Sequence, residues 1–173
     1  VFKYKKRLHV LEIGIGSGCI LLSILNEKDD FYGVGIDISK KCIELSKLNA
    51  MALGLINRVK FCKTDVDNFN SGKYDLIISN PPYIDKHQLK YLGVSEYEPC
   101  KALNGGVSGT EILSKVIIKA TQLLKINGKL IIEIGSDQKY KVINLLNNSN
   151  FFINKIIKDL SNHDRCIVST KLI

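Results

Sequence analysis

The chain has 173 residues, 45% of them hydrophobic, and no apolar stretch long enough to cross a bilayer. These values are typical of a soluble globular protein and exclude membrane-spanning and disordered classes. The net charge of +8 comes mainly from lysines spread along the chain, which favours a solvated basic surface over a dedicated nucleic-acid face. We therefore expect one domain over residues 1–173.

The cysteines and histidines are scattered. Five cysteines are an odd number, and no two form a C-x-x-C pair, which indicates reduced thiols in a cytoplasmic protein. No clustered ligands point to a metal site. The basic segment that begins at Val1 lacks signal-peptide features, and we expect that something preceded it.

In chain order, the first half alternates strands and helices. The hydrophobic pattern predicts a strand at 8–13, a glycine turn at 14–18, a helix after it, a strand at 32–38, a second helix and a strand at 59–62. Ser39 is the expected cap of the second helix, and Gly54 is its expected end. Apolar contacts of that helix are predicted at Ile43, Leu45, Leu48 and Ala52.

The second half begins with a short β-branched strand at 76–78, which Pro81 must end because proline cannot donate to a sheet ladder. A weakly patterned segment at 84–109 is predicted to be a loop or lid on the substrate side. A helix at 110–124, a turn at Asn127-Gly128, a strand at 129–134 and a helix at 137–146 follow.

The last two strands, at 151–158 and 165–171, have no helix between them and should form an antiparallel hairpin. The expected fold is therefore α/β: a Rossmann-like doubly wound sheet, mostly parallel, with one antiparallel edge strand.

Ligands of doubly wound sheets bind outside the carboxyl ends of the strands. Gly14, Gly16 and Gly18 lie there, where they let the backbone pass close to a ligand and face it with amide donors. Cys19 stands where a dinucleotide fingerprint has its third glycine, which argues against NAD.

Two acids follow the next two strands. Asp37 lies about twenty residues beyond the glycine turn, where a carboxylate can accept from both hydroxyls of a ribose. Asp65 is placed to accept from an exocyclic amine, and the Val66 backbone could meet the edge of the ring. Each acid alone is as readily a cap or a turn residue, whereas together they favour an adenosine ligand.

The Asn80-Pro81-Pro82-Tyr83 turn carries the predicted chemistry. The Asn80 side-chain carbonyl and the Pro81 main-chain carbonyl can accept from both N–H groups of one planar amino group, on which Tyr83 could stack. Acceptors aimed at both hydrogens favour a transition state in which positive charge grows on nitrogen. The structural alternative is a turn that only ends a strand.

These residues resemble the class I S-adenosylmethionine-dependent methyltransferases of amino groups, and most closely the HemK/PrmC family of release factor glutamine methyltransferases. The specific similarity is in Tyr97-Glu98-Pro99, Ala102-Leu103, Gly105-Gly106, Gly109, Asp159-Leu160 and Asp164-Arg165.

The resemblance implies that Asn80, Pro81, Pro82 and Tyr83 hold the glutamine of a Gly-Gly-Gln loop of peptide chain release factors. It implies contacts with S-adenosylmethionine, without a metal, by Glu12, Gly14, Ile15, Gly16, Ser17, Gly18, Asp37, Ile38, Asp65, Val66 and Asn80. Two features depart from the family. The chain begins after the family's helical N-terminal domain, and Cys100 replaces the arginine of its Glu-Pro-Arg motif.

Three alternatives stay open beside this interpretation. They are an adenine-N6 methyltransferase of DNA or RNA, a ribosomal-protein glutamine methyltransferase, and a nucleotide-binding module without catalysis. Among partners, we expect release factors and no membrane; nucleic acid is not required and not excluded.

Overall fold

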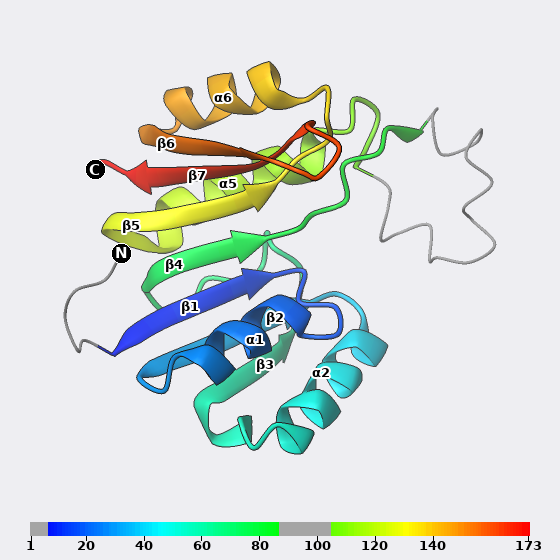
Figure 1. The fold of residues 1–173 in the computed structure, drawn as a ribbon, viewed down its shortest axis with the longest axis vertical. Coiled ribbons are helices and arrows are strands. Elements are labelled where there is room, and N and C mark those ends of the chain that lie inside the picture. Colours follow the sequence, from blue (N-terminus) through cyan, green and yellow to red (C-terminus); the bar gives the residue numbers. More distant parts are fainter. Residues whose placement is uncertain (1–6, 87–104) are drawn as a thin grey trace.

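The computed structural model describes residues 7–86 and 105–173, in which the strands form one sheet of seven (Figure 1). The strands are β1 (Leu8–Ile13), β2 (Phe31–Asp37), β3 (Val59–Lys63), β4 (Tyr74–Ser79), β5 (Leu124–Glu133), β6 (Phe151–Lys158) and β7 (Asp164–Lys171). The helices are α1 (Cys19–Glu27), α2 (Lys40–Ala52), the short 3-10 turn η1 (Ile56–Arg58), α5 (Glu111–Leu123) and α6 (Lys139–Asn148). Within the described ranges, no helix combines the length and apolar character needed to span a membrane.

The strand order, β3-β2-β1-β4-β5-β7-β6, confirms the doubly wound fold. Strands β1 to β5 pair in parallel, so their carboxyl ends meet at one edge of the sheet (Figure 1). The predicted hairpin of the last two strands is also confirmed. The antiparallel strand is β7, which pairs with β5 and thus lies one place in from the edge strand β6.

The chain winds outward from β1 to β3 and then returns to β4 on the other side of β1. The strand order therefore reverses between β1 and β4. Such a reversal opens a crevice above the carboxyl ends of the two strands, because the connections leave in opposite directions.

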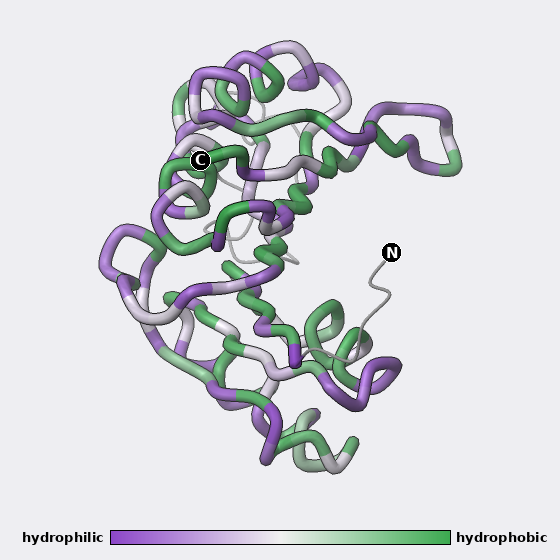
Figure 2. The backbone as a smooth tube through the Cα atoms, turned by 90° about the vertical axis from the view of Figure 1, so that its left-hand side faces the viewer, coloured by the Kyte–Doolittle hydropathy of each residue, from purple (hydrophilic) through white to green (hydrophobic). Residues whose placement is uncertain are grey.

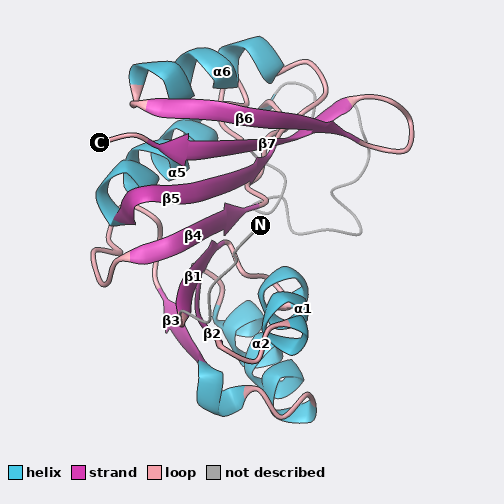
Figure 3. Cartoon of the chain, turned by 60° about the vertical axis from the view of Figure 1, so that its left-hand side comes forward, coloured by secondary structure: helices cyan, strands magenta, loops and turns pink. Residues whose placement is uncertain are grey.

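Both faces of the sheet are covered, as Figure 3 shows, so alternate residues of a strand enter different cores. Val10 and Ile78 pack with α1 and α2, whereas Leu11 and Ile77 pack with α5 and α6. Burial on both faces explains why these strands read as nearly continuous hydrophobic runs, which are green in Figure 2.

The predicted contacts of α2 were wrong in part. Leu45 and Leu48 are 46% and 63% exposed, and Ala52 is exposed too. The helix instead buries a narrower stripe that consists of Ile43, Ser46 and Ala50. Small side chains at Ser46 and Ala50 let the backbone of α2 approach its neighbours closely, which a leucine on that face would prevent.

The predicted start of α2 is confirmed, since Ser39 Oγ accepts from Cys42 N at 3.3 Å. The Asn127-Gly128 turn lies inside β5, which is longer than predicted. Asn127 has φ 64°, and the pairing of β4 with β5 shifts register between Tyr74 and Leu76. The turn signal therefore marks an irregularity within a strand.

The side chain of Glu12 binds the first turn of α1 and so fixes where the helix starts. It lies on β1, is 2% exposed, and its Oε2 accepts from Leu21 N at 2.9 Å. This bond replaces a side-chain cap, because the cap position is Gly18. Burial raises the pKa of Glu12 to about 8; the Leu21 N–H opposes the rise, and the charge of Asp37 adds to it.

We predict that burial of Glu12 makes the folded protein less stable as pH rises. Its folded pKa lies above the unfolded value, so the folded state holds the extra proton between about pH 4.5 and 8 and loses stability across that window. The free energy of unfolding should fall by up to ~3 kcal/mol from pH 5 to 8. Glu12→Gln, which retains an acceptor for Leu21 N, should flatten this slope in denaturant titrations.

The matched control is Glu27→Gln at the exposed end of α1, which should keep the wild-type slope. Parallel curves for wild type and Glu12→Gln would show instead that Glu12 is ionised in the folded protein throughout.

Candidate active site

The glycine turn leaves β1 and leads directly into α1. Gly14 and Gly16 have φ of 75° and 56°, in the left-handed region that favours glycine. The N–H groups of Gly14 and Ile15 both donate to Ile36 O at 2.9 Å, which ties the turn to β2. A Cβ at either Gly14 or Gly16 would meet no atom of the described residues within 4 Å, apart from the neighbouring residues in the chain. The turn is therefore open on the side from which a ligand would approach.

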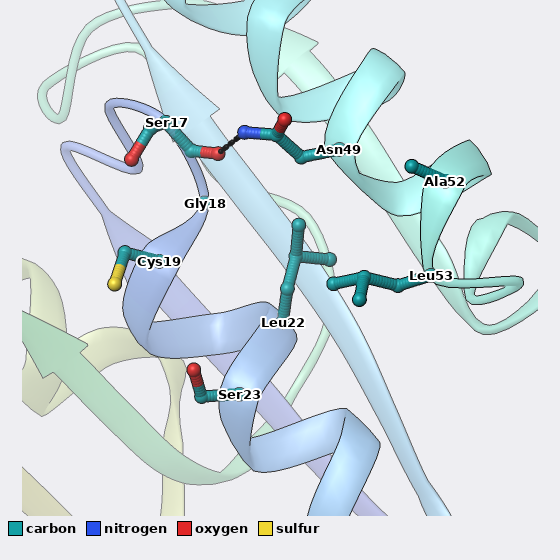
Figure 4. A pocket seen from close by; sticks show the side chains of 8 residues that line it. All are labelled: Ser17, Gly18, Cys19, Leu22, Ser23, Asn49, Ala52 and Leu53. Carbon is teal, nitrogen blue, oxygen red and sulfur yellow. Dashed lines mark hydrogen bonds between the residues drawn. The ribbon is translucent and has the colours of Figure 1, made fainter.

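Gly18 has a different function in the turn. A Cβ there would lie 2.9 Å from Leu22 Cδ1 and 3.2 Å from Ser46 Cβ. Gly18 thus allows α1 and α2 to pack closely, and of the three glycines it is the one that contacts helices. The turn is also held from α2, because Asn49 Nδ2 donates to Ser17 O at 2.9 Å (Figure 4).

A groove of about 430 Å³ lies beside this turn, between α1 and α2 (Figure 4). Its lining consists of Ser17, Gly18, Cys19, Leu22, Ser23, Asn49, Ala52 and Leu53. It includes neither Asp37 nor Asn80. The groove therefore shares Ser17 and Gly18 with the glycine turn but is not lined by the residues at the ends of β2 and β4.

Asp37 stands at the end of β2 and contacts the glycine turn. Its Oδ2 accepts from Gly16 N at 3.0 Å and its Oδ1 from Ser39 N at 2.8 Å. Each carboxylate oxygen retains a further lone pair, so these bonds still permit the carboxylate to accept from hydroxyl groups. Ile38, the next residue, is 55% exposed and offers an apolar surface at the same edge.

Asp65 is engaged in a turn. Its Oδ1 accepts from Asn68 N and its Oδ2 from Asn68 Nδ2, both at 2.8 Å. This is the turn role that was the alternative for Asp65. Val66, which follows, is half-buried and packs against the core formed with α5 and α6.

Asn80 lies beside the glycine turn because of how β4 pairs with β1. Ile13 and Ser79, the last residues of their strands, are paired, and Ser79 Oγ donates to Ile13 O at 2.8 Å. The next residues, Gly14 and Asn80, therefore leave the sheet side by side. Asn80 is exposed, and no hydrogen bond of its side chain is recorded in the described part of the chain.

Tyr83 is anchored by residues that the motifs had not assigned to it. Its hydroxyl donates to Glu133 Oε1 at 3.2 Å, and the Arg165 guanidinium lies 5.9 Å from the ring centroid. Arg165 is held in turn by Asp159 Oδ2, which accepts from both Nε and Nη2 at 3.1 Å. Burial and the charge of Glu133 raise the pKa of Tyr83, so the hydroxyl stays protonated as a donor. Pro81 is buried, and Pro82 is half-buried.

Gln138 is the site residue for which the sequence offered no signal. It is 5% exposed at the start of α6, and its side chain bonds to both ends of the β4–α5 connection and to the loop after β5. Of the predicted segment 84–109, the structure describes only the ends, 84–86 and 105–109. The Tyr97-Glu98-Pro99 and Ala102-Leu103 motifs, and the departure at Cys100, lie outside the described residues.

Comparisons with known proteins show the family and the fold to which the chain is similar. The family described as "Methyltransferase domain" matches residues 4–170. The chain is 36% identical over 164 residues to a release factor glutamine methyltransferase of Rhodospirillum rubrum, which covers 94% of this chain and 50% of that protein. It is 37% identical over 169 residues to the protein of the same name from Fusobacterium nucleatum, covering 95% and 48%.

The chain thus spans about half the length of these curated relatives. Among solved structures, the magnesium protoporphyrin IX methyltransferase of Synechocystis PCC 6803, determined with bound SAM, superposes with a TM-score of 0.68 at 18% identity. The superposition covers 96% of this chain and 71% of that one. Because the family match runs almost from end to end and the fold is shared, this chain belongs to the methyltransferase domain family.

Proposed function

We propose that this chain transfers a methyl group from S-adenosylmethionine to the side-chain amide nitrogen of the glutamine in the Gly-Gly-Gln motif of peptide chain release factors. The observation that carries the proposal is the pairing of Ile13 with Ser79, from which the glycine turn and Asn80 leave the sheet together. The names of the two relatives support the choice of substrate.

The open glycine turn fits such a cofactor, since no atom of the described residues would come within 4 Å of a Cβ at Gly14 or Gly16. When bound, S-adenosylmethionine supplies a sulfonium methyl group that a nucleophile can attack. Asp37 would accept from the ribose hydroxyls, with Ile38 beside it as an apolar surface for the base. The N–H groups at the start of α1 would face the carboxylate of the ligand.

Asn80 and Pro81 would hold the accepting amide. An amide nitrogen is a poor nucleophile because its lone pair is delocalised into the carbonyl group. The Asn80 side-chain oxygen and the Pro81 carbonyl accept from its two N–H groups, and these bonds strengthen as positive charge develops on the nitrogen. Orientation adds to this effect and can supply several kcal/mol of the barrier, about 7–11 at the upper end.

No general base is required in this mechanism, because an alkylated amide becomes strongly acidic and loses its proton after transfer. Asp75 is unsuited to that role. It is the second residue of β4, at the amino end of the strand and far from Asn80, where its Oδ2 accepts from His9 N and Lys125 Nζ. Burial alone would raise the pKa of Asp75, but these bonds hold that pKa below its usual value.

Replacement of Asn80 tests the role of the turn. Asn80→Ala should leave cofactor affinity largely intact, since Gly14, Gly16 and Asp37 are untouched, and should lower the rate of transfer ~10²–10³-fold. Calorimetric titration with the cofactor product and single-turnover transfer would measure the two effects separately. Asn144→Ala, at an exposed position of α6, is the matched control. Undiminished transfer by Asn80→Ala would mean that the turn only ends a strand.

Labelled methyl transfer tests the substrate. With labelled S-adenosylmethionine, label should appear on a purified release factor and be absent when its Gly-Gly-Gln glutamine is replaced. A DNA duplex and isolated ribosomal proteins serve as parallel acceptors. Label on the glutamine-replaced factor, or only on DNA or a ribosomal protein, would overturn the proposal in favour of one of the alternative substrates.

A further inference from the structure

We propose that Gln138 is a positioning residue for the transfer: its side-chain amide holds the backbone after Asn80-Pro81-Pro82 against the segment 105–109, and thereby orients the turn that receives the substrate. The inference rests on the proposed function. It adds a residue to which neither the motifs nor the family resemblance assigned a role.

Three hydrogen bonds define the position of the amide. Gln138 Nε2 donates to Tyr83 O at 2.8 Å and to Gly109 O at 3.1 Å, and Gln138 Oε1 accepts from Gly135 N at 3.0 Å. The carbonyls belong to the loops after β4 and before α5, and the N–H to the loop after β5. One buried side chain therefore joins the two ends of the β4–α5 connection to the loop after β5.

Two glycines, Gly105 and Gly109, let the segment before α5 approach the backbone of Tyr83 closely. Gly109 has φ 73°, and a Cβ there would lie 2.7 Å from Tyr83 O and 2.9 Å from Gln138 Nε2. A Cβ at Gly105 would lie 2.8 Å from Tyr83 Cα and 2.9 Å from Pro82 O. Both glycines thus face the turn itself, and any larger residue would push the two segments apart.

Two backbone bonds complete the contact. Gly105 N donates to Ile84 O at 2.8 Å, and Lys86 N donates to Gly106 O at 3.0 Å. The chain just beyond Tyr83 is thereby paired with the segment that precedes α5. Gln138, at the start of α6, bonds to both of these paired segments.

The Gln138 amide holds the end of the Asn80–Tyr83 turn, whereas Ser79 holds its beginning. Ser79, the residue before Asn80, is fixed by its hydrogen bond to Ile13 O, and Gln138 fixes the carbonyl of Tyr83, three residues after Asn80. The two prolines between them have fixed φ angles, so a constraint at both ends sets the direction of the Asn80 and Pro81 acceptors. Because the cofactor turn and Asp37 lie on the β1 and β2 side, Gln138 should affect transfer and leave cofactor binding unchanged.

The arrangement specifically needs an amide, because it uses two donors and one acceptor. A glutamate in its place would keep the acceptor for Gly135 N and turn a charged oxygen towards two carbonyl groups. The ionisable groups nearby are Glu133 and Arg165 at Tyr83, Glu111 at the start of α5, and Asp85 and Asp137 in the adjoining turns. All of them are present in wild type as well, so any pH effect specific to the variant comes from position 138.

The test compares Gln138→Glu with Gln122→Glu, a matched control at an exposed position near the end of α5. At saturating cofactor and pH 8, Gln138→Glu should transfer label to the release factor about tenfold more slowly than wild type, with unchanged cofactor affinity. A carboxyl group buried among carbonyls has a raised pKa, and its protonation restores one donor. The ratio of variant to wild-type rates should therefore rise severalfold between pH 8 and 6.

A second readout does not depend on catalysis. Amide hydrogen exchange at Gly105 and Lys86 should accelerate in Gln138→Glu at pH 8 and remain as in wild type in Gln122→Glu. A wild-type protein that labels no release factor would refute the proposed function, whereas the exchange measurement would still test the contact itself. Wild-type exchange in Gln138→Glu, or a rate ratio that is independent of pH, would overturn the positioning role.

If Gln138→Glu does not fold, Gly109→Ala provides the same test with Gln138 intact. Its Cβ would separate Tyr83 O from the amide, so transfer should fall to a similar extent, without recovery at low pH. Wild-type transfer by Gly109→Ala would overturn the proposal.

Discussion

The buried hydrogen bond from Ser79 Oγ to the carbonyl of Ile13 marks the contact on which the candidate site depends. It closes the pairing of β1 with β4 at the last residue of each strand, where the order of the sheet reverses. A shift of one residue in this pairing would turn the side chains of β4 to the other face and carry Asn80 away from Gly14. The two cores enforce the register, because alternate residues of both strands are committed to opposite faces.

The loops beyond the carboxyl ends of the strands are held by polar contacts from three buried or half-buried side chains. Glu12 holds α1, Asp37 holds the glycine turn, and Gln138 holds the backbone after Tyr83. In each case a side chain satisfies backbone groups that the loop itself leaves without partners. The protein's own contacts thus orient these loops before any ligand arrives.

Much of this was predictable because it follows from local patterns. The strands are β-branched runs, the glycine turn follows β1 directly, and Ser39 is a typical cap, so their positions came from neighbours in sequence. The predictions for α2 failed because helical spacing does not show which of two apolar stripes faces the protein. Ser46 and Ala50 are buried instead of Leu45 and Leu48, because the close packing of α2 against Gly18 requires small side chains.

The roles of Gln138, Glu133 and Arg165 could not be predicted, since each depends on partners 29 to 82 residues away that only the folded sheet brings near. Asp65 illustrates a different limit. Its position after a strand suits both a ligand and a turn, and only the coordinates show Asn68 bonded to both of its oxygens. For Asn80, the sequence predicted the position at the end of a strand. It did not show that Gly14 would be its neighbour across the crevice.

The most direct test of the account is a crystal structure of the chain with S-adenosylhomocysteine. We predict that the ligand lies over Gly14 and Gly16, with its ribose at Asp37 and its sulfur facing Asn80. A ligand bound instead in the groove between α1 and α2, against Leu22 and Leu53, would contradict it. That result would mean that the pairing of β1 with β4 does not build the methyl-transfer site.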